Sequence, residues 1–467
     1  MLADIEDLVA QFRSGKPIPV EMNAAEVEYV CKGLLNWYTV NRRKLPWRGD
    51  AADESSGFET PPKSPYGTWV SEIMLQQTRV ETVVPFWHRW MAKYPTVSAL
   101  AAATPEEVNA MWAGLGYYRR AQALLNGARD VVARFGGEVP DAVDDLKSIK
   151  GIGPYTAGAI ASIAYNKVEP LVDGNVVRVL SRLRAQKAEV GSTELDKACW
   201  KLCAQIVDPH HPGDFNQALM ELGATVCTPR SPACSSCPIS NVCLAHGLVI
   251  VGSHSETGTG GDLPASETYF PITKSKKAPR SVILSVSIFR RGGEAEPRYL
   301  FVRRPASGLL ANQWEFPSCT VWEELPPAHK KCKVEQHDVE PPHDLSADVL
   351  WEPFPQLLGQ LGYSWMEKSD SAACLLLPEQ PPAVIGSIEH VFSHQRHTMH
   401  AVLRDVTVVN AAEDEETNDL MPPTHRWMTA AEIIDAGITS GCKKLLSAVL
   451  AKTEGRRATK AKSKRKS

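Results

Sequence analysis

Residues 146–160, which read LKSIKGIGPYTAGAI, decide the fold of the first half of this chain. The stretch predicts the end of one helix, a tight turn at Gly151 and Gly153, and the start of a second helix. Two glycines let the backbone come close to a ligand, and the second helix presents its free N–H groups there. This arrangement suits a DNA phosphate and carries no information about the base. A helix–turn–helix connection without any ligand is the alternative from these residues alone.

Two acidic residues lie on either side of this hairpin in the sequence. Asp173 lies downstream in VDGNV (172–176), at an expected helix start, and Glu72 lies upstream in SEIMLQQT (71–78), inside an apolar helical run. Burial of an unpaired carboxylate is costly and raises its pKa towards that of a usable general acid. Each acid alone is typical of a helix cap or an ion pair. Together they match glycosidic bond cleavage, in which one acid protonates the leaving group and the other faces the cationic sugar.

Four of the eleven cysteines are clustered with the spacing C-x6-C-x2-C-x5-C, at Cys227, Cys234, Cys237 and Cys243. Thiolates at this spacing would repel one another without a bound cation, so the pattern predicts either a zinc site or an iron–sulfur cluster. Structural zinc commonly uses two C-x2-C hooks, whereas only the middle pair forms one here, and this difference favours the cluster. The other cysteines are scattered and are expected to be buried free thiols.

The composition is that of an ordinary globular protein, with 467 residues, 43% hydrophobic and 22% charged residues and a net charge of −3. The length predicts roughly two to three domains. The net charge says little about nucleic acid, because acidic segments elsewhere can offset a local basic groove. No stretch reaches the roughly 18 apolar residues of a membrane span, and the N-terminus lacks a signal-peptide pattern. We therefore expect an intracellular protein without a membrane partner.

The chain divides into an all-α part and an α+β part. Apolar residues recur with helical spacing in the first part, and no segment there alternates with period two. Helical runs are expected at Trp69–Trp90, Pro105–Ala113, Arg119–Arg134 and Glu194–Ile206. Strands are expected at Ser281–Phe289, Tyr299–Val302 and Met399–Val409, and later helices at Ala430–Asp435 and Lys443–Leu450. The expected divisions are an N-terminal extension (1–23), a helical domain (24–250) with its cysteine loop (227–243), a Gly-, Ser-, Thr- and Pro-rich linker without an apolar face (251–280), a second domain (281–453) and a basic tail (454–467).

These motifs, together with GLGYY (114–118), resemble the MutY adenine DNA glycosylases, a branch of the endonuclease-III-like helix–hairpin–helix superfamily. The resemblance runs almost continuously from Trp37 to Cys243. It implies an all-α helix–hairpin–helix glycosylase domain with a [4Fe–4S] cluster on the four cysteines. It also implies a monomeric enzyme that excises adenine mispaired with 8-oxoguanine or G in double-stranded DNA, by extruding the base from the stack.

The resemblance further implies roles for individual residues. Glu72 would protonate the extruded adenine and later activate water, and Asp173 would stabilise the cationic sugar or trap it covalently. Asn175 would hold Asp173, and Tyr155 would line the pocket. Arg48 and Glu221 would contact the adenine, whereas Gln77 and Tyr117 would wedge into the duplex. Gly151 and Gly153 would bind the phosphate backbone.

Tyr155 narrows the expected chemistry. Bifunctional relatives carry a lysine there that attacks the sugar, and a tyrosine cannot form a Schiff base. Some bacterial members carry another lysine at the place of Val177. We therefore expect base removal without strand cleavage. The alternatives are a bifunctional glycosylase/lyase, which Tyr155 disfavours, and a non-catalytic redox-sensing DNA-binding protein, which the two retained acids disfavour.

The second domain is similar to the MutT-like, Nudix-fold C-terminal domain of the same family, on the residues SGLLANQWEFP (307–317). Active Nudix hydrolases need a glutamate-rich helix that binds magnesium, whereas only Glu323 and Glu324 follow here before a double proline. Recognition without hydrolysis is therefore expected. The segment HVFSH (390–394) matches the loop that reaches 8-oxoguanine, and its Ser393 can both donate and accept a hydrogen bond.

Three segments depart from this resemblance or extend beyond it. An acidic insertion spans Asp50–Ser64, and neither its role nor that of the N-terminal extension follows from the sequence. The tail at Arg456–Lys466 is strongly basic, which is typical either of a solvated end or of a nuclear-targeting or DNA-tethering segment. We expect the protein in the nucleus, with the mitochondrion as an additional location.

Overall fold

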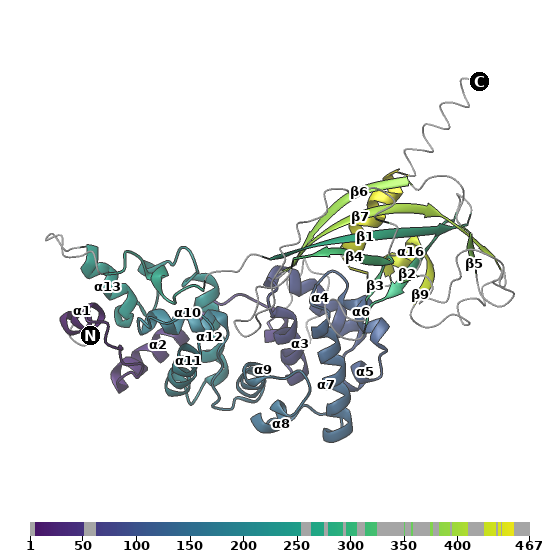
Figure 1. Cartoon of the computed structure of the whole chain (residues 1–467). Coiled ribbons are helices and arrows are strands. Elements are labelled where there is room, and N and C mark those ends of the chain that lie inside the picture. Colours follow the sequence, from purple (N-terminus) through teal and green to yellow (C-terminus); the bar gives the residue numbers. More distant parts are fainter. Residues whose placement is uncertain are drawn as a thin grey trace, which may run out of the picture. The chain divides into compact units, whose positions relative to one another are not determined.

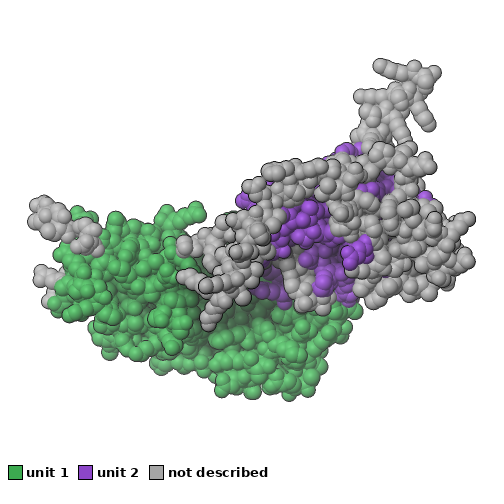
Figure 2. All heavy atoms as spheres, in the orientation of Figure 1, with its two compact units in different colours: residues 1–105, 120–275 green, residues 106–119, 276–467 purple. Residues whose placement is uncertain are grey.

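The structure is a computed structural model, and its described residues form two compact units. Unit 1 comprises residues 1–105 and 120–275, and unit 2 comprises residues 106–119 and 276–467 (Figure 2). The described residues are 5–50, 62–253, 263–274, 279–292, 296–305, 313–324, 350, 356–357, 374–376, 383–392, 395–409, 425–435, 438–439 and 441–452. Ser393, the basic tail and residues 51–61 of the insertion lie outside them. Among the helices so described, none combines the length and apolarity needed to cross a bilayer.

Unit 1 is helical, as the apolar periodicity predicts (Figure 1). Its elements are α1 (Ile5–Arg13), α2 (Ala24–Asn41), η1 (Pro46–Arg48), α3 (Pro65–Leu75), α4 (Val80–Lys93), α5 (Val97–Ala101), α7 (Arg119–Phe135), α8 (Val143–Lys147), α9 (Pro154–Ala159), the π-helical turn η3 (Ile160–Ala164), α10 (Gly174–Leu183), α11 (Thr193–Ile206), α12 (Pro212–Thr225), η4 (Cys234–Ser236), η5 (Ser240–Val242), α13 (Leu244–Ser253) and η7 (Glu267–Tyr269). The single run expected at Trp69–Trp90 is instead α3 and α4, because the chain turns at Gln77, whose φ is +55°.

The core of unit 1 lies between α2, α10, α11 and α12. Helix α10 contributes Val176, Val179, Leu180 and Leu183, all buried, at the i, i+3, i+4 and i+7 spacing of an amphipathic helix. Helix α12 passes very close to α10, because a Cβ at Gly223 would lie 2.7 Å from the Cβ of Asn175. This close approach fixes the first turn of α10, where two predicted site residues lie.

The predicted hairpin forms between α8 and α9. Gly151 has a φ of +87°, and a Cβ there would lie 2.7 Å from the Cβ of Ala123, so both the backbone conformation and the packing require glycine. Gly153 precedes α9, and no heavy atom of the described residues lies within 4 Å of a Cβ built there. The hairpin therefore packs through Gly151 and leaves its second glycine open.

The expected linker at 251–280 corresponds only in part to what the structure shows. Helix α13 continues to Ser253, and Phe270 is completely buried. Phe270 packs edge-to-face against Phe12 of α1, with ring centroids 6.0 Å apart, and α1 also contacts α13. The expectation of no apolar face is therefore wrong for residues 263–274. Composition missed this because a few apolar residues in a mostly polar segment make the contacts, among them Leu263, Tyr269 and Phe270.

Unit 2 holds a mixed sheet with helices, which confirms the expected α+β class. It also includes most of α6 (Pro105–Trp112), which the expected boundaries placed in the helical domain at 24–250. Its strands are β1 (Arg280–Arg291), β2 (Arg298–Arg303), β3 (Trp314–Glu315), β4 (Ser318–Glu323), β5 (Cys374–Leu376), β6 (Ala383–Val391), β7 (Gln395–Asp405), β8 (Thr407–Val409) and β9 (His425–Thr429). The main sheet has the order β3-β2-β1-β7-β6, in which β1 and β7 are parallel, with β4 paired to β1 and β9 to β2. The strand expected at Met399–Val409 is divided between β7 and β8.

Two helical segments cover the apolar core of unit 2. Ile433 of α16 (Ala430–Asp435), together with Leu445 and Val449 of the helix at 441–452, packs against the buried strand residues. The first of these helices begins with a capping box. The Oγ1 atom of Thr429 accepts a hydrogen bond from the Glu432 backbone, and the Glu432 carboxylate accepts one from the Thr429 backbone.

Candidate active site

Glu72 is buried on α3, with 5% of its surface exposed. Helix α3 begins with Pro65 in its first turn, and Ser64 caps it by accepting a hydrogen bond from the Gly67 backbone at 3.0 Å. The side chain of Glu72 accepts a hydrogen bond from the hydroxyl of Tyr155. Burial raises the pKa of Glu72 to about 7, and the charge of Asp173 adds to the increase, while Tyr155 and Arg48 oppose it. Glu72 can therefore carry a proton at neutral pH.

Tyr155 reaches Glu72 from α9, which lies beside α3 (Figure 1). Its hydroxyl also lies 3.4 Å from the Sδ atom of Met220. Burial, together with the charges of Glu72 and Asp173, raises the pKa of Tyr155 well above 10. The tyrosine therefore stays neutral and can donate its hydrogen to the Glu72 carboxylate.

Asp173 caps the N-terminus of α10, as the sequence predicts. Its Oδ1 atom accepts a hydrogen bond from the Val176 backbone at 2.7 Å, and its Oδ2 atom accepts one from the Asn175 amide at 2.9 Å. Burial raises the pKa of Asp173, and these hydrogen bonds oppose the shift. Each carboxylate oxygen thus has one fixed donor, which holds the group in a single orientation. Each retains a lone pair for a cationic partner.

Arg178, which no sequence motif identified, extends this arrangement to the cysteine loop. Its guanidinium donates to the Asn175 side chain at 2.8 Å, to the Gly223 carbonyl at 2.6 Å and to the Cys227 carbonyl at 2.8 Å. Arg178 lies three residues after Asn175 and so on the same helix face, which is the signal that could have identified it. The orientation of Asp173 is thereby connected through two side chains to the first cysteine of the loop.

Arg48 and Glu221 meet in a buried ion pair, with Nη2 and Oε2 2.9 Å apart. Arg43, which no sequence motif identified either, pairs with the same carboxylate at 2.7 Å. Although burial would raise the pKa of Glu221, the hydrogen bond from Arg43 and the charge of Arg48 hold it below its usual range. The Nε atom of Arg48 is buried and has no hydrogen-bond partner among the described residues. This N–H group can therefore donate a hydrogen bond to an acceptor atom of a ligand.

Both residues predicted to wedge into DNA have left-handed backbones. Gln77, in unit 1, has a φ of +55°, and Tyr117, in unit 2, has a φ of +49° with 44% of its surface exposed. Residues other than glycine seldom adopt this conformation, and it concentrates at binding and catalytic sites. The sequence contains no signal for it, because neither residue is glycine or asparagine.

The four predicted cysteines line one cavity in unit 1. Burial raises the pKa of Cys234 to about 12 and that of Cys237 to about 11, so their thiolates need a cation to form. Arg182 donates to the Sγ atom of Cys227 at 3.3 Å, as a cation beside a metal-bound thiolate would. The donor set and its surroundings fit an iron–sulfur cluster held by Cys227, Cys234, Cys237 and Cys243.

Two more potential ligands lie beside this cavity. The ligand atoms of Cys234, His246 and Glu267 all lie within 4.8 Å of one another, and the His246 Nδ1 atom is 2.8 Å from the Glu267 carboxylate. Glu267 belongs to η7, in the stretch expected to be a linker. Sequence spacing could not identify this pair, because tertiary packing brings it to the cysteine loop.

Loss of one cysteine ligand is expected to remove the cluster. Cys237→Ser should lose most of the bound iron and destabilise the fold by about 4 kcal/mol or more, as is usual when a structural metal is lost. Iron content and thermal unfolding of the purified protein measure both effects. Cys319 is a half-buried cysteine in unit 2, and Cys319→Ser is the matched control, which should keep its iron. Full iron content in Cys237→Ser would contradict the ligand assignment.

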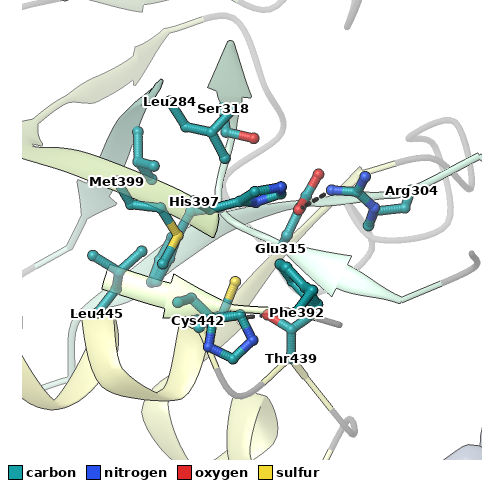
Figure 3. Close-up of a pocket in the computed structure, with 14 residues that line it drawn as sticks. Leu284, Arg304, Glu315, Ser318, Phe392, His397, Met399, Thr439, Cys442 and Leu445 are labelled. Carbon is teal, nitrogen blue, oxygen red and sulfur yellow. Dashed lines mark hydrogen bonds and ion pairs between the residues drawn. The ribbon is translucent and has the colours of Figure 1, made fainter. Parts of the chain in front are cut away.

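Unit 2 contains a small pocket beside the predicted recognition segment, with Phe392, His397 and the ion pair of Arg304 with Glu315 in its lining (Figure 3). The Phe392 ring packs edge-to-face between two histidine rings, with centroids 4.5 Å from His390 and 4.8 Å from His397. The Phe392 amide donates to the Gln395 carbonyl at 2.7 Å. The residues immediately before and after 393–394 are therefore held in place, whereas Ser393 itself lies outside the described residues.

Comparison with known proteins identifies relatives over nearly the whole chain. Residues 70–205 match the model of the HhH-GPD superfamily of base excision DNA repair proteins, and residues 227–243 match the iron–sulfur binding domain of endonuclease III. Adenine DNA glycosylase of Homo sapiens is 38% identical over 91% of this chain and 74% of its own length. The Mus musculus adenine DNA glycosylase is 38% identical, over 92% of this chain and 80% of its own length. A thermostable thymine-DNA glycosylase structure aligns at 27% identity over 47% of this chain and 95% of its own, with a TM-score of 0.40.

These matches confirm three expectations from the sequence. The helical unit is a helix–hairpin–helix glycosylase domain, the chain is an enzyme of base excision repair, and its cysteine loop binds an iron–sulfur cluster rather than zinc. The roles of single side chains stay predictions, because the matches cover whole domains. The geometry brings Glu72, Tyr155 and Asp173 into electrostatic contact with one another.

Proposed function

Since the chain belongs to the adenine DNA glycosylases, we propose that it excises adenine opposite 8-oxoguanine and leaves the DNA strand intact. The observation that carries this proposal is the buried Glu72, whose pKa is raised to about 7 and whose carboxylate accepts a hydrogen bond from Tyr155. A carboxyl group with such a pKa is protonated in part at neutral pH and can act as a general acid.

The proposed reaction begins when adenine leaves the base stack and enters the pocket. Glu72 donates its proton to a ring nitrogen of the adenine, and the bond between the base and the sugar then breaks. The hydroxyl of Tyr155 stabilises the Glu72 carboxylate that remains. This carboxylate can then take a proton from the water that attacks the sugar, which returns Glu72 to its starting state.

Asp173 is proposed to face the positive charge that develops on the sugar. Its two oxygens are already held by the Val176 backbone and the Asn175 amide, so the group need not reorient during the reaction. A fixed anion close to a developing cation lowers the barrier, because no solvent has to reorganise around it. A covalent bond between the Asp173 carboxylate and the sugar is the second way in which the same group could act.

Arg48 is proposed to help hold the extruded base. Its buried Nε–H lacks an acceptor among the described residues, which is costly unless a ligand supplies one. An adenine ring nitrogen is such an acceptor. Glu221, with both oxygens occupied by Arg43 and Arg48, is proposed to act mainly by orienting these cations.

Intact strands are proposed because Tyr155 cannot form an imine with the sugar. The test incubates the purified protein with duplexes containing A opposite 8-oxoguanine, A opposite G, or 8-oxoguanine opposite C. We expect abasic sites in the first two duplexes and breaks only after alkali. Breaks without alkali would overturn the proposal of base removal alone, and no product from either adenine duplex would overturn the proposed activity.

Ser393 is proposed to recognise 8-oxoguanine through its N7–H and O8. Ser393→Ala should lower the preference for A opposite 8-oxoguanine over A opposite G by roughly tenfold, the effect of about one lost hydrogen bond. Single-turnover rates on the two duplexes measure the preference. Ser387→Ala, at an exposed position of the adjoining strand β6, is the control and should leave it unchanged. The same ratio in Ser393→Ala and wild type would rule out this role.

A further inference from the structure

Arg120 is a buried arginine at the start of α7, with 5% of its surface exposed. Its guanidinium lies at the C-terminus of α3, the helix that carries Glu72. The Nη1 atom donates to the carbonyls of Ile73, Met74 and Gln76 at 3.1, 2.7 and 2.6 Å, and Nη2 donates to the Thr78 hydroxyl at 3.2 Å. One side chain therefore holds four groups around a single turn.

These contacts replace the usual way of ending a helix. The last carbonyls of a helix lack partners within it, and a glycine in the left-handed conformation commonly satisfies them. Helix α3 instead continues into Gln76, with φ −55° and ψ 111°, and then into Gln77, with φ +55°. A left-handed residue other than glycine costs about 1 kcal/mol or more. The cation at the negative end of the helix offsets this cost.

The contacts of Arg120 lie on both sides of Gln77. The Gln76 carbonyl and the Thr78 hydroxyl, one residue before and one after, bind the same guanidinium. A change in the Gln77 backbone moves these two groups relative to one another, so both hydrogen bonds oppose its departure from the left-handed conformation. Its side chain is exposed, so the turn presents it to solvent in one fixed shape.

We propose that Arg120 is a positioning residue for base extrusion, which holds the turn so that Gln77 enters the duplex already in its left-handed conformation. The inference rests on the proposed function, in which Gln77 wedges into DNA beside the lesion. A turn that is ordered beforehand loses less entropy when it meets DNA, so more of the binding energy can open the base stack. Lysine cannot replace the planar fork of arginine, because its single ammonium group cannot reach all four acceptors in this geometry.

The test compares Arg120→Lys with Arg129→Lys, since both residues lie on α7 and both donate to helix-end carbonyls. Arg129 donates to the Ala101 and Ala103 carbonyls at 3.2 and 2.9 Å, at the end of α5, and so controls for a general loosening of α7. Each protein is assayed in single turnover on two duplexes. One holds adenine opposite 8-oxoguanine, and the other holds an unpaired, bulged adenine that costs less to extrude.

We expect Arg120→Lys to slow excision of the paired adenine by roughly 100-fold, and that of the bulged adenine by about threefold at most. The two effects differ because a misplaced Gln77 impairs extrusion of the base and leaves the chemical step unchanged. Arg129→Lys should match wild type on both duplexes. Equal losses on the two duplexes, or no loss on the paired one, would overturn the proposal. If the wild-type protein releases no adenine from the duplex with 8-oxoguanine, the proposed function itself is overturned.

A second variant and a second measurement cover the case in which Arg120→Lys does not fold. Thr78→Val removes only the hydroxyl that binds Nη2 and the Gln76 carbonyl. With 2-aminopurine in place of the target adenine, wild type should show the rise in fluorescence that accompanies unstacking. A smaller rise in Thr78→Val, with excision of the bulged adenine unchanged, supports the role. A rise equal to that of wild type would contradict it.

Discussion

Glu72→Gln is expected to bind the lesion duplex normally and to lose excision by roughly 1000-fold, within the range that general acid–base groups contribute. Glutamine has nearly the same shape, so the pocket keeps its packing and Tyr155 keeps an acceptor. The side chain can no longer deliver a proton to the adenine or take one from water. Single-turnover excision and binding to the same duplex, measured in parallel, separate chemistry from affinity. Normal turnover by this variant would refute the proposed role of Glu72.

The pH dependence follows from the same residue. The pKa of Glu72 is raised from 4.5 to about 7 by burial, so the proton needed for catalysis is lost as the pH rises through about 7. The wild-type excision rate should then fall by about tenfold per pH unit above that value, whereas the residual rate of Glu72→Gln should not change in this window. A wild-type rate that stays constant up to pH 9 would contradict this assignment.

The thermal stability of Glu72→Gln is the control for its folding. Because the folded-state pKa is the higher one, the stability that comes from burying protonated Glu72 is present at low pH and lost as the pH rises through about 7. Glu72→Gln should therefore unfold at the same or a higher temperature than wild type at pH 8. Glu194→Gln, at an exposed position in the first turn of α11, is the control for the same chemical change and should keep full excision.

Asp173→Asn is expected to lower excision by about 100- to 1000-fold, the range found when one preorganised electrostatic group is removed. The substitution removes the charge that faces the developing sugar cation. It keeps an oxygen that can accept the Val176 backbone hydrogen bond, so α10 keeps its cap. Single-turnover excision at saturating enzyme is the measurement. Retention of more than about a tenth of the rate would argue against electrostatic stabilisation as the main role of Asp173.

This substitution carries a stability cost that must be measured beside the activity. The new amide can direct its nitrogen at the Asn175 amide, which now donates to Asp173 at 2.9 Å. Two donors in contact cost about 1–3 kcal/mol unless one rotates. Thermal unfolding should detect this change. If excision is lost at a temperature where the variant is fully folded, the missing charge of Asp173 is the cause.

The local motifs were sufficient for the class of fold and for naming the candidate site residues. The spacing of the four cysteines predicts a metal loop, and Gly151 predicts a turn that only glycine can make there. The pairing of Glu72 with Asp173 was predictable because each lies in a recognisable local context. Arg43, Arg178 and Arg120 were not, because arginine is common in helices and its partner can lie anywhere in the chain.

What the sequence by itself determined is therefore the set of reactive groups and the elements that carry them. Only the tertiary structure decided how these groups meet: Tyr155 lies 83 positions from Glu72, and Arg43 lies 178 positions from Glu221. The pKa of Glu72 depends on how completely other helices exclude water from it. Likewise, the shape of the Gln77 turn depends on Arg120, 44 positions after Gln76. Such contacts depend on the packing of whole helices, which no local pattern encodes.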